Sequence, residues 1–197
     1  MKVSVKRFRG DAARPYLQEL ARLRIEVFRE FPYLYNGDLD YECNYLNTYA
    51  DVADGVIVVA FDADRAVGAS TGLPLSSETD EIRQPFIGNG YDVGKVFYFG
   101  ESVLENSYRG QGIGVRFFEE REAHARSLGR FTWTAFCAVQ RPPDHPRRPP
   151  DYVPLDEFWG RRGYRKHPEL NTTLAWRDLD ENAASAKPMV FWLKRIA

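Results

Sequence analysis

The spacing of apolar and polar residues along the chain predicts a protein that alternates strands with helices. Strict alternation and short apolar runs are typical of strands, and they fall at residues 1–10, 55–61, 66–72, 95–104, 130–139, 171–179 and 188–196. Apolar residues three and four positions apart are typical of helices, and they fall at residues 11–29, 38–50 and 112–128, with short helices near residues 81 and 158. The order of these elements predicts an α/β (α+β) fold in which helices flank a mixed central sheet.

Length and composition narrow the class of protein. No repeat and no linker divides the 197 residues, so we expect one domain spanning residues 1–197. The formal net charge of −1 gives no electrostatic case for nucleic acid or for an anionic membrane. Two cysteines cannot form a disulfide framework, and no apolar run is long enough to cross a bilayer. We therefore expect a cytoplasmic protein with neither nucleic acid nor membrane as a partner. The histidines are too far apart in sequence to predict a metal site.

A cluster of glycines stands where the helix at 112–128 begins, within the sequence ENSYRGQGIGVRFFEE. Glycine destabilises a helix interior by about 0.5–1 kcal/mol relative to alanine. The first N–H groups of a helix lack partners within the helix, and glycine lets an anion approach them without meeting a Cβ atom. The pattern therefore predicts a phosphate site whose donors are Arg109, Gly110, Gln111, Gly112, Ile113 and Gly114.

Two familiar nucleotide-binding patterns do not fit this loop. A P-loop requires Lys-Ser/Thr after its last glycine, but Val115 and Arg116 follow Gly114. The dinucleotide pattern G-x-G-x-x-G requires a glycine at position 115. A nucleotide-phosphate binder is therefore disfavoured.

The loop instead resembles the acyl-CoA-binding motif of the GCN5-related N-acetyltransferase (GNAT) family. That motif, Arg/Gln-x-x-Gly-x-Gly/Ala, is met by Arg109, Gly112 and Gly114, and the later FWGRRGY (158–164) is similar to the family's FYEKLGF. The resemblance implies a mostly antiparallel sheet of about seven strands and acetyl-CoA as the acyl donor, with no metal. It also implies an N-acetyltransferase whose acceptor is a primary amine of a small molecule or peptide.

The resemblance also implies roles around the donor. The strand before the loop would splay from the next strand, and the backbone of Val103 and Leu104 would pair with the pantetheine. Glu101 is the candidate base that removes the proton of the amine, and Tyr98 is a second polar candidate. Strand alternation places Glu101 and Val103 on one face with Phe99, and Tyr98 on the other. A structural alternative, in which Glu101 only pairs with a nearby arginine or helix N-terminus, stays open.

One position departs from the family pattern. A tyrosine often protonates the leaving thiolate, but this chain has Trp159 there, and an indole cannot act as that acid. Trp159 could instead pack on the pantetheine, while water or another tyrosine, such as Tyr152 or Tyr164, supplies the proton. The departure also keeps open a catalytically impaired acyl-CoA-binding module with a regulatory role.

The acceptor side is predicted less closely. The resemblance implies that the first two helices and the last two strands wall the acceptor site. Tyr33 and Tyr35, beside Pro32 and Gly37, suit a shaped loop that presents rings to a ligand. The proline-rich stretch Arg141–Pro154 could form a lid. The aromatic C-terminal strands could pair across a homodimer.

Overall fold

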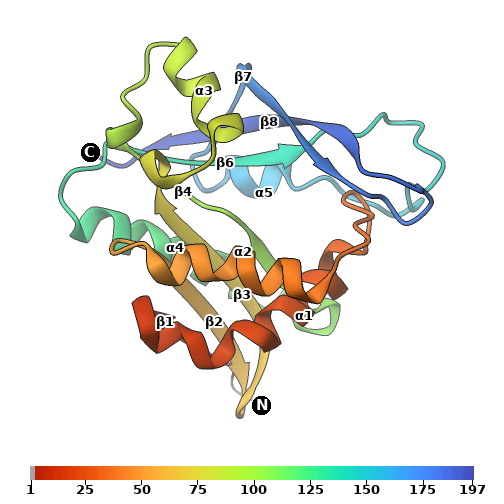
Figure 1. Cartoon of the computed structure of the whole chain (residues 1–197), viewed down its shortest axis with the longest axis horizontal. Helices are drawn as coiled ribbons and strands as arrows, with labels where there is room; N and C mark the ends of the chain where they lie inside the picture. Colours follow the sequence, from red (N-terminus) through yellow and green to blue (C-terminus); the bar gives the residue numbers. More distant parts are fainter. Residues whose placement is uncertain (1–2) are drawn as a thin grey trace.

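A computed structural model describes residues 3–197 and shows a twisted sheet covered by helices (Figure 1). The strands are β1 (Ser4–Phe8), β2 (Val56–Asp62), β3 (Arg65–Pro74), β4 (Val96–Tyr98), β5 (Ser102–Leu104), β6 (Trp133–Val139), β7 (Arg165–Trp176) and β8 (Ser185–Arg195). The α-helices are α1 (Leu17–Phe28), α2 (Leu39–Asp51), α3 (Asp80–Gly88), α4 (Ile113–Ser127) and α5 (Asp156–Gly160). Short 3₁₀ turns occur at Gly10–Tyr16, Leu75–Ser77, Val93–Lys95 and Asn106–Tyr108.

All of these strands belong to one eight-stranded sheet with the order β1-β2-β3-β4-β6-β8-β7, and β5 pairs with β3. The β4–β6 pair is parallel, and the other pairs formed by residues 3–197 are antiparallel. The prediction of a mixed, mostly antiparallel sheet flanked by helices is confirmed. One strand more than expected arises because the run at 95–104 is broken into β4 and β5.

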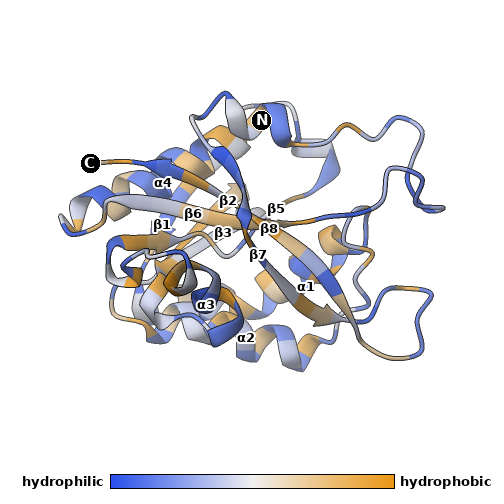
Figure 2. Ribbon diagram, turned by 90° about the horizontal axis from the view of Figure 1, so that it is seen from above, coloured by the Kyte–Doolittle hydropathy of each residue, from blue (hydrophilic) through white to orange (hydrophobic). Residues whose placement is uncertain are grey.

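The helices cover both faces of the sheet. The view from above shows α1, α2 and α3 on one face and α4 on the other (Figure 2). Strand β2 lies between these layers, so Val56–Phe61 is buried on both sides. That position explains why the run is continuously apolar rather than alternating. Each helix turns an apolar stripe to the sheet, as Leu17 and Leu20 do on α1 and Phe117 does on α4.

The first predicted helix begins differently from the expectation. Gly10–Tyr16 forms a 3₁₀ turn that contains Pro15, and the α-helix starts only at Leu17. Asp11 does not cap it, since its carboxylate accepts a hydrogen bond from Arg14 Nε at 2.7 Å. The spacing of apolar residues therefore predicted the helix but not the residue at which it begins. No helix within residues 3–197 combines the length and apolar character that a membrane span needs.

The break between β4 and β5 positions the site. Phe99 N donates to the carbonyl of Ala135 on β6 at 2.7 Å, which is the last bond between these two parts of the sheet. Beyond it, β5 stays with β3 and β6 stays with β8. The two strands therefore diverge from the break at 99–101.

Candidate active site

Strand β5 has an unpaired edge, because it pairs with β3 on one side and with no strand on the other within residues 3–197. This gap in backbone pairing between β5 and β6 is called the opening. The carbonyl of Glu101 accepts a hydrogen bond from β3 at 3.1 Å, and the N–H of Glu105 donates one to β3 at 3.0 Å. In an antiparallel pair, such bonds fall at every second residue. The backbone groups of Ser102 and Leu104 therefore face away from β3, toward the opening before β6.

This register separates the two residues expected to offer backbone groups to a ligand. Leu104 faces the opening, whereas the backbone of Val103 is turned toward its partner Ala69 on β3. The Val103 side chain is buried among residues of α1 and α2, while Phe99 packs on the α4 face. The expectation that Phe99 and Val103 share one face is wrong, because the break between the strands interrupts the alternation.

Arg121 of α4 hydrogen-bonds to residues at the break between β4 and β5, on the face of the sheet that α4 covers. Its side chain is fully buried, and its Nη1 donates to the carbonyls of Thr71 and Glu101 at 3.2 and 3.0 Å. Its Nη2 donates to Ser102 Oγ at 2.8 Å, and the guanidinium carbon lies 4.2 Å from the centre of the Phe99 ring. Burial lowers the pKa of Arg121 to about 10, so it remains charged at neutral pH. One guanidinium therefore holds β3 and the start of β5 together.

Helix α4 begins beside the same opening with free backbone donors. Gly112 is its N-cap residue, and Arg116 N is the first amide bonded within the helix, to the carbonyl of Gly112 at 3.1 Å. No side chain caps this end, and the amides of Ile113, Gly114 and Val115 have no acceptor among residues 3–197. The positive end of the helix dipole adds to these donors. The start of α4 thus offers free backbone donors, and the anion site at these donors stays a prediction.

The glycines of the loop have different physical roles. Gly110 and Gly112 have φ angles of +75° and +81°, and a Cβ atom on either would meet no atom within 4 Å. They shape the loop and leave open space in front of it. A Cβ on Gly114 would lie 3.3 Å from the Phe158 ring, so Gly114 permits close packing of α4 against α5.

The remaining loop residues use their groups locally. The Arg109 amide donates to the carbonyl of Asn106 at 3.1 Å, which removes it from the expected anion donors. Its side chain crosses the opening, with Nε 3.2 Å from the carbonyl of Leu104 and Nη1 2.8 Å from Glu30 Oε2. Gln111 Nε2 donates to the carbonyl of Ser107 at 3.1 Å. The Arg109 side chain must therefore move if a ligand is to reach Leu104.

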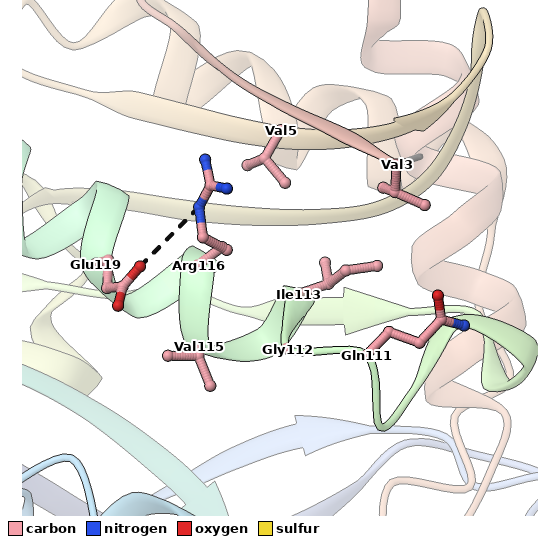
Figure 3. Close-up of a pocket in the computed structure, with 8 residues that line it drawn as sticks. All are labelled: Val3, Val5, Gln111, Gly112, Ile113, Val115, Arg116 and Glu119. Atoms are coloured by element: carbon pink, nitrogen blue, oxygen red, sulfur yellow. Dashed lines mark ion pairs between the residues drawn. The ribbon is translucent and has the colours of Figure 1, made fainter. Parts of the chain in front are cut away.

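A depression of about 560 Å³ reaches the loop from the β1 side (Figure 3). Its lining residues are Val3, Val5, Gln111, Gly112, Ile113, Val115, Arg116 and Glu119. The pocket lies across α4 from Phe158, which contacts Gly114 on the other side. It is therefore separate from the opening between β5 and β6, although both reach the same amides.

The α1–α2 face of the break carries a buried charge cluster. Arg24 of α1 forms an ion pair with Glu42 of α2 and a second one with Glu101, whose Oε2 lies 2.5 Å from Arg24 Nη1. The Tyr45 ring lies 4.3 Å from the guanidinium carbon, and Tyr45 Oη donates to Glu101 Oε2 at 3.1 Å. The second carboxylate oxygens of Glu42 and Glu101 are buried and have no hydrogen-bond partner among residues 3–197. Two carboxylates thus share one arginine away from water.

Tyr98 lies on the same side of the break as Glu101, contrary to the expected alternation. Its hydroxyl contacts Cys137 Sγ at 3.1 Å, and burial raises its pKa well above the ordinary value. Burial also raises the pKa of Cys137 to about 12, so this residue is a neutral thiol rather than a nucleophile. Burial, followed by the nearby Cys137, raises the pKa of Tyr33.

The loop between α1 and α2 is held against the last strands. The Tyr33 carbonyl accepts from Trp176 Nε1 at 3.0 Å and from Arg141 Nη2 at 2.9 Å, and Arg141 also pairs with the buried Asp178. Tyr35 bridges to Asp178 through the backbone. Burial and the negative charge of Glu42 raise the pKa of Tyr35. The two predicted substrate-side tyrosines therefore lie in one loop, which hydrogen bonds hold against Trp176, Arg141 and Asp178.

The aromatic residues near α5 pack rather than titrate at neutral pH. The Trp159 ring lies 5.1 Å from both the Phe136 and Trp192 rings. The Tyr164 hydroxyl contacts Thr134 Oγ1 at 2.9 Å and donates to Glu122 at 3.1 Å, so it is unavailable as an acid. Among residues 3–197, no three His, Cys, Asp or Glu side chains are grouped so that they could hold a metal ion.

Arg24 and Arg121 were not predicted as site residues, although the sequence around each indicates that its side chain is buried. Each occupies a position on the apolar stripe of its helix, where Leu20 and Phe117 stand one turn earlier. A charged residue on a buried face requires hydrogen-bonded partners. The pattern could indicate a buried network, but it could not name the partners.

No protein-family model matches the sequence, and no curated protein sequence matches it. Solved structures do match over nearly the whole chain. An acetyltransferase of the GNAT family from Staphylococcus aureus Mu50 matches with a TM-score of 0.62 at 10% identity, with 100% of each chain covered. A ribosomal-protein-alanine N-acetyltransferase from Brucella melitensis matches with a TM-score of 0.62 at 13% identity, with 99% of each covered. A Salmonella typhimurium protein determined with its cofactor acetyl-CoA matches with a TM-score of 0.61 at 8% identity, covering 99% of this chain and 94% of the other.

These similarities establish the fold. The chain has the fold of the GNAT acetyltransferases, as the glycine loop and the order of elements predicted.

Proposed function

We propose that this protein transfers the acetyl group of acetyl-CoA to a primary amine of a small molecule or peptide. The observation that carries the proposal is the opening between β5 and β6 beside the uncapped start of α4. A ligand with an anionic group and a chain that contains amide groups fits these two features. Its anion suits the free N–H groups of α4, and its amides suit the unpaired backbone of β5. The amides of Ile113, Gly114 and Val115 would hold the diphosphate, and the backbone of Ser102 and Leu104 would pair with the pantetheine.

The residues of the α1–α2 face suit the acceptor. A lysine-like amine has a pKa of about 10.4, so its neutral form costs about 4.6 kcal/mol at pH 7. The excess of carboxylates around Arg24 favours binding of a cationic ammonium group beside the break. Glu101 is the base predicted from the sequence, and its ion pair with Arg24 is the structural alternative foreseen for it. The Arg24 contact occupies one carboxylate oxygen of Glu101, Oε2.

The alternative of an impaired acyl-CoA-binding module depends on the missing acid at position 159. Trp159 packs in an apolar cluster and Tyr164 is bonded in the core, so neither of these two residues supplies that proton. A thiol with a pKa near 8.5 leaves as a thiolate at a cost of only about 2 kcal/mol at pH 7. Loss of that acid is therefore compatible with catalysis, and we favour the enzyme.

Two measurements test the proposal. Isothermal titration with CoA tests the donor site. Release of free thiol from acetyl-CoA then tests transfer, with spermidine, a peptide that begins with alanine, and an aminoglycoside as separate probes. We expect CoA to bind and at least one probe to release thiol and gain an acetyl group, as read by mass spectrometry. CoA binding without transfer to any probe would favour the binding module, and absence of CoA binding would contradict both.

A further inference from the structure

Four oxygen atoms form a continuous chain beside the β4–β5 break. Glu78 Oε1, in the turn between β3 and α3, accepts from Tyr49 Oη at 3.3 Å. Tyr49 Oη contacts Tyr45 Oη at 2.7 Å, and Tyr45 Oη reaches Glu101 Oε2 at 3.1 Å. The chain thus connects a carboxylate near the surface with the carboxylate that Arg24 holds.

The backbone is shaped to admit this chain. A Cβ atom on Gly100 would lie 1.9 Å from Tyr49 Oη, so only glycine leaves room for the hydroxyl. Gly100 belongs to the break from which β5 and β6 diverge. The middle of the chain therefore lies against the point where, under the proposed function, the thioester would be held.

A count of hydrogens shows that the chain can take up one proton. Three oxygen–oxygen contacts need three hydrogens, but the hydroxyls of Tyr45 and Tyr49 supply two. A third proton on one of the end carboxylates completes all three bonds. The end at Glu101 already has a cationic partner, because Arg24 Nη1 lies 2.5 Å from its Oε2. The free end is Glu78, which has no ion pair with Lys, Arg or His in the described part of the chain.

The surroundings of Glu78 favour protonation at that end. Burial raises its pKa, and the negative charge of Glu101 raises it further, while hydrogen bonds from the Thr79 amide and Tyr49 oppose the shift. The titratable groups that face it from other elements are Tyr45 and Tyr49 on α2, Tyr98 on β4, Glu101 in the break and Cys137 on β6. The tyrosines and the cysteine are neutral at pH 7, because burial raises the pKa of each.

Resting on the proposed function, we infer that Glu78 is the terminal acceptor for the proton that the ammonium group of the substrate must lose. The Tyr45 hydroxyl first turns its hydrogen from Glu101 to Tyr49, whose oxygen it contacts at 2.7 Å. The proton of the ammonium group then enters at Tyr45, the hydrogen that Tyr45 held passes to Tyr49, and that of Tyr49 passes to Glu78. The freed nitrogen lone pair forms a C–N bond with the thioester carbonyl carbon, and the C–S bond breaks. Sulfur leaves with the electron pair and receives the second proton of the nitrogen. Glu78 then returns its proton to water.

This inference changes the role of Glu101. Glu101 orients Tyr45 and anchors the chain to Arg24, and the relay passes no proton to it. Glu78 would act through the two tyrosines and need not touch the substrate. Its role differs from a purely structural one, since it matters only while the amine must be deprotonated.

The test compares Glu78→Gln with Glu81→Gln, an exposed glutamate of the neighbouring α3 helix. The readouts are the pH profile of kcat/KM on the responding probe amine, the Kd for CoA, and the carboxyl titration of ¹³C-labelled glutamates. We expect wild type and Glu81→Gln to share one glutamate that titrates above the ordinary range, and Glu78→Gln to lack it. At pH 7, Glu78→Gln should lower kcat/KM by at least about tenfold, with CoA affinity unchanged. The deficit should shrink toward pH 10, where the amine loses its proton unaided.

Tyr49→Phe separates the chain from the carboxylate alone. It keeps Glu78 but removes the middle hydroxyl, so it should show the same deficit and the same recovery at high pH. An unchanged profile in Glu78→Gln, or a deficit equal at every pH, would overturn this inference while transfer by the wild type upholds the proposed function. Failure of the wild type to acetylate any probe would overturn the proposed function and this inference with it.

Discussion

The two sides of the candidate site are built from different parts of the polypeptide. On the donor side, the useful groups are backbone amides at the start of α4 and backbone edges of β5. On the acceptor side, they are side chains that α1, α2, the β3–α3 turn and the β4–β5 break bring together. One side depends on loop conformation, and the other depends on charge and on the positions of hydroxyl groups.

This difference determines which substitutions disrupt each side of the candidate site. A backbone site tolerates most side-chain changes but fails when its loop is filled or capped. A buried side-chain network fails when one partner is removed, because the remaining charges stay buried without compensation. Substitutions in the two regions should therefore separate ligand binding from stability.

The largest expected effect is on the acceptor side. Arg24→Met removes the cation that Glu42 and Glu101 share, and it leaves two buried carboxylates uncompensated. We expect the free energy of unfolding to fall by about 3–5 kcal/mol, measured by urea denaturation. Arg22→Met, on the exposed side of the same helix, should stay within about 0.5 kcal/mol of wild type. Equal stability of the two variants would show that the cluster does not hold the face together.

Arg121→Lys tests the fastening between the two regions. A lysine cannot satisfy the carbonyls of Thr71 and Glu101 together with Ser102 Oγ, which the guanidinium does. We expect a loss of about 2–3 kcal/mol in the free energy of unfolding and weaker CoA binding, because the start of β5 is released. The matched change Arg126→Lys, on the exposed face of α4, should alter neither quantity measurably. A stable Arg121→Lys variant with normal CoA affinity would contradict the fastening role.

Gly112→Asp tests the donor side. Asp tolerates positive φ better than most residues, and its carboxylate would enter the open space before the amides. It would cap those amides and repel a diphosphate, so the Kd for CoA should rise at least about tenfold, or about 1.4 kcal/mol.

Gly90→Asp is the matched control for that change. Gly90 has a φ of +79° and equally open surroundings, but it lies in the turn after α3. It should lose similar stability and keep wild-type CoA affinity. If the two aspartate variants bind CoA equally well, the amides at the start of α4 are not the anion site.

The smallest expected effect is on the pH dependence of the protein's stability, and it arises from His124 of α4. Burial lowers the pKa of His124 below its ordinary 6.5, and its Nε2 contacts the Asp54 carbonyl at 2.9 Å. Below pH 6.5 the unfolded chain then binds more protons at this residue than the folded chain, so stability falls as the pH is lowered. His124→Gln should flatten the decline in Tm between pH 7 and 5, and His145→Gln in the β6–α5 loop should keep the wild-type slope. Parallel slopes for all three proteins would exclude His124 as the cause.

The same division explains what the sequence could predict. The sheet, the helices and the donor loop follow from period, glycine placement and apolar runs, all of which are local. The break at 99–101 carries no local signal, because FYFGESVL reads as one continuous strand. The strand stops there because the guanidinium of Arg121 binds the backbone carbonyl of Glu101 and because β6 diverges from this point. Both features depend on the tertiary structure.

The acceptor side could not be predicted in the same way. Glu78, Tyr45 and Glu101 are far apart in the sequence, and only tertiary packing brings their oxygens into one chain. On α2, Tyr45 and Tyr49 carry the polar network, while Tyr41 is exposed. Glu101 was found because it precedes a recognisable loop, and its partner Arg24 was not.

The most direct test of the account is the amide spectrum of ¹⁵N-labelled protein titrated with CoA. We predict the largest chemical-shift changes at the amides of Ile113, Gly114 and Val115 and along Ser102–Leu104, with the turn around Gly90 unchanged. Changes confined to other amides, or no change at millimolar CoA, would contradict the claim that this loop and this opening bind the acyl donor.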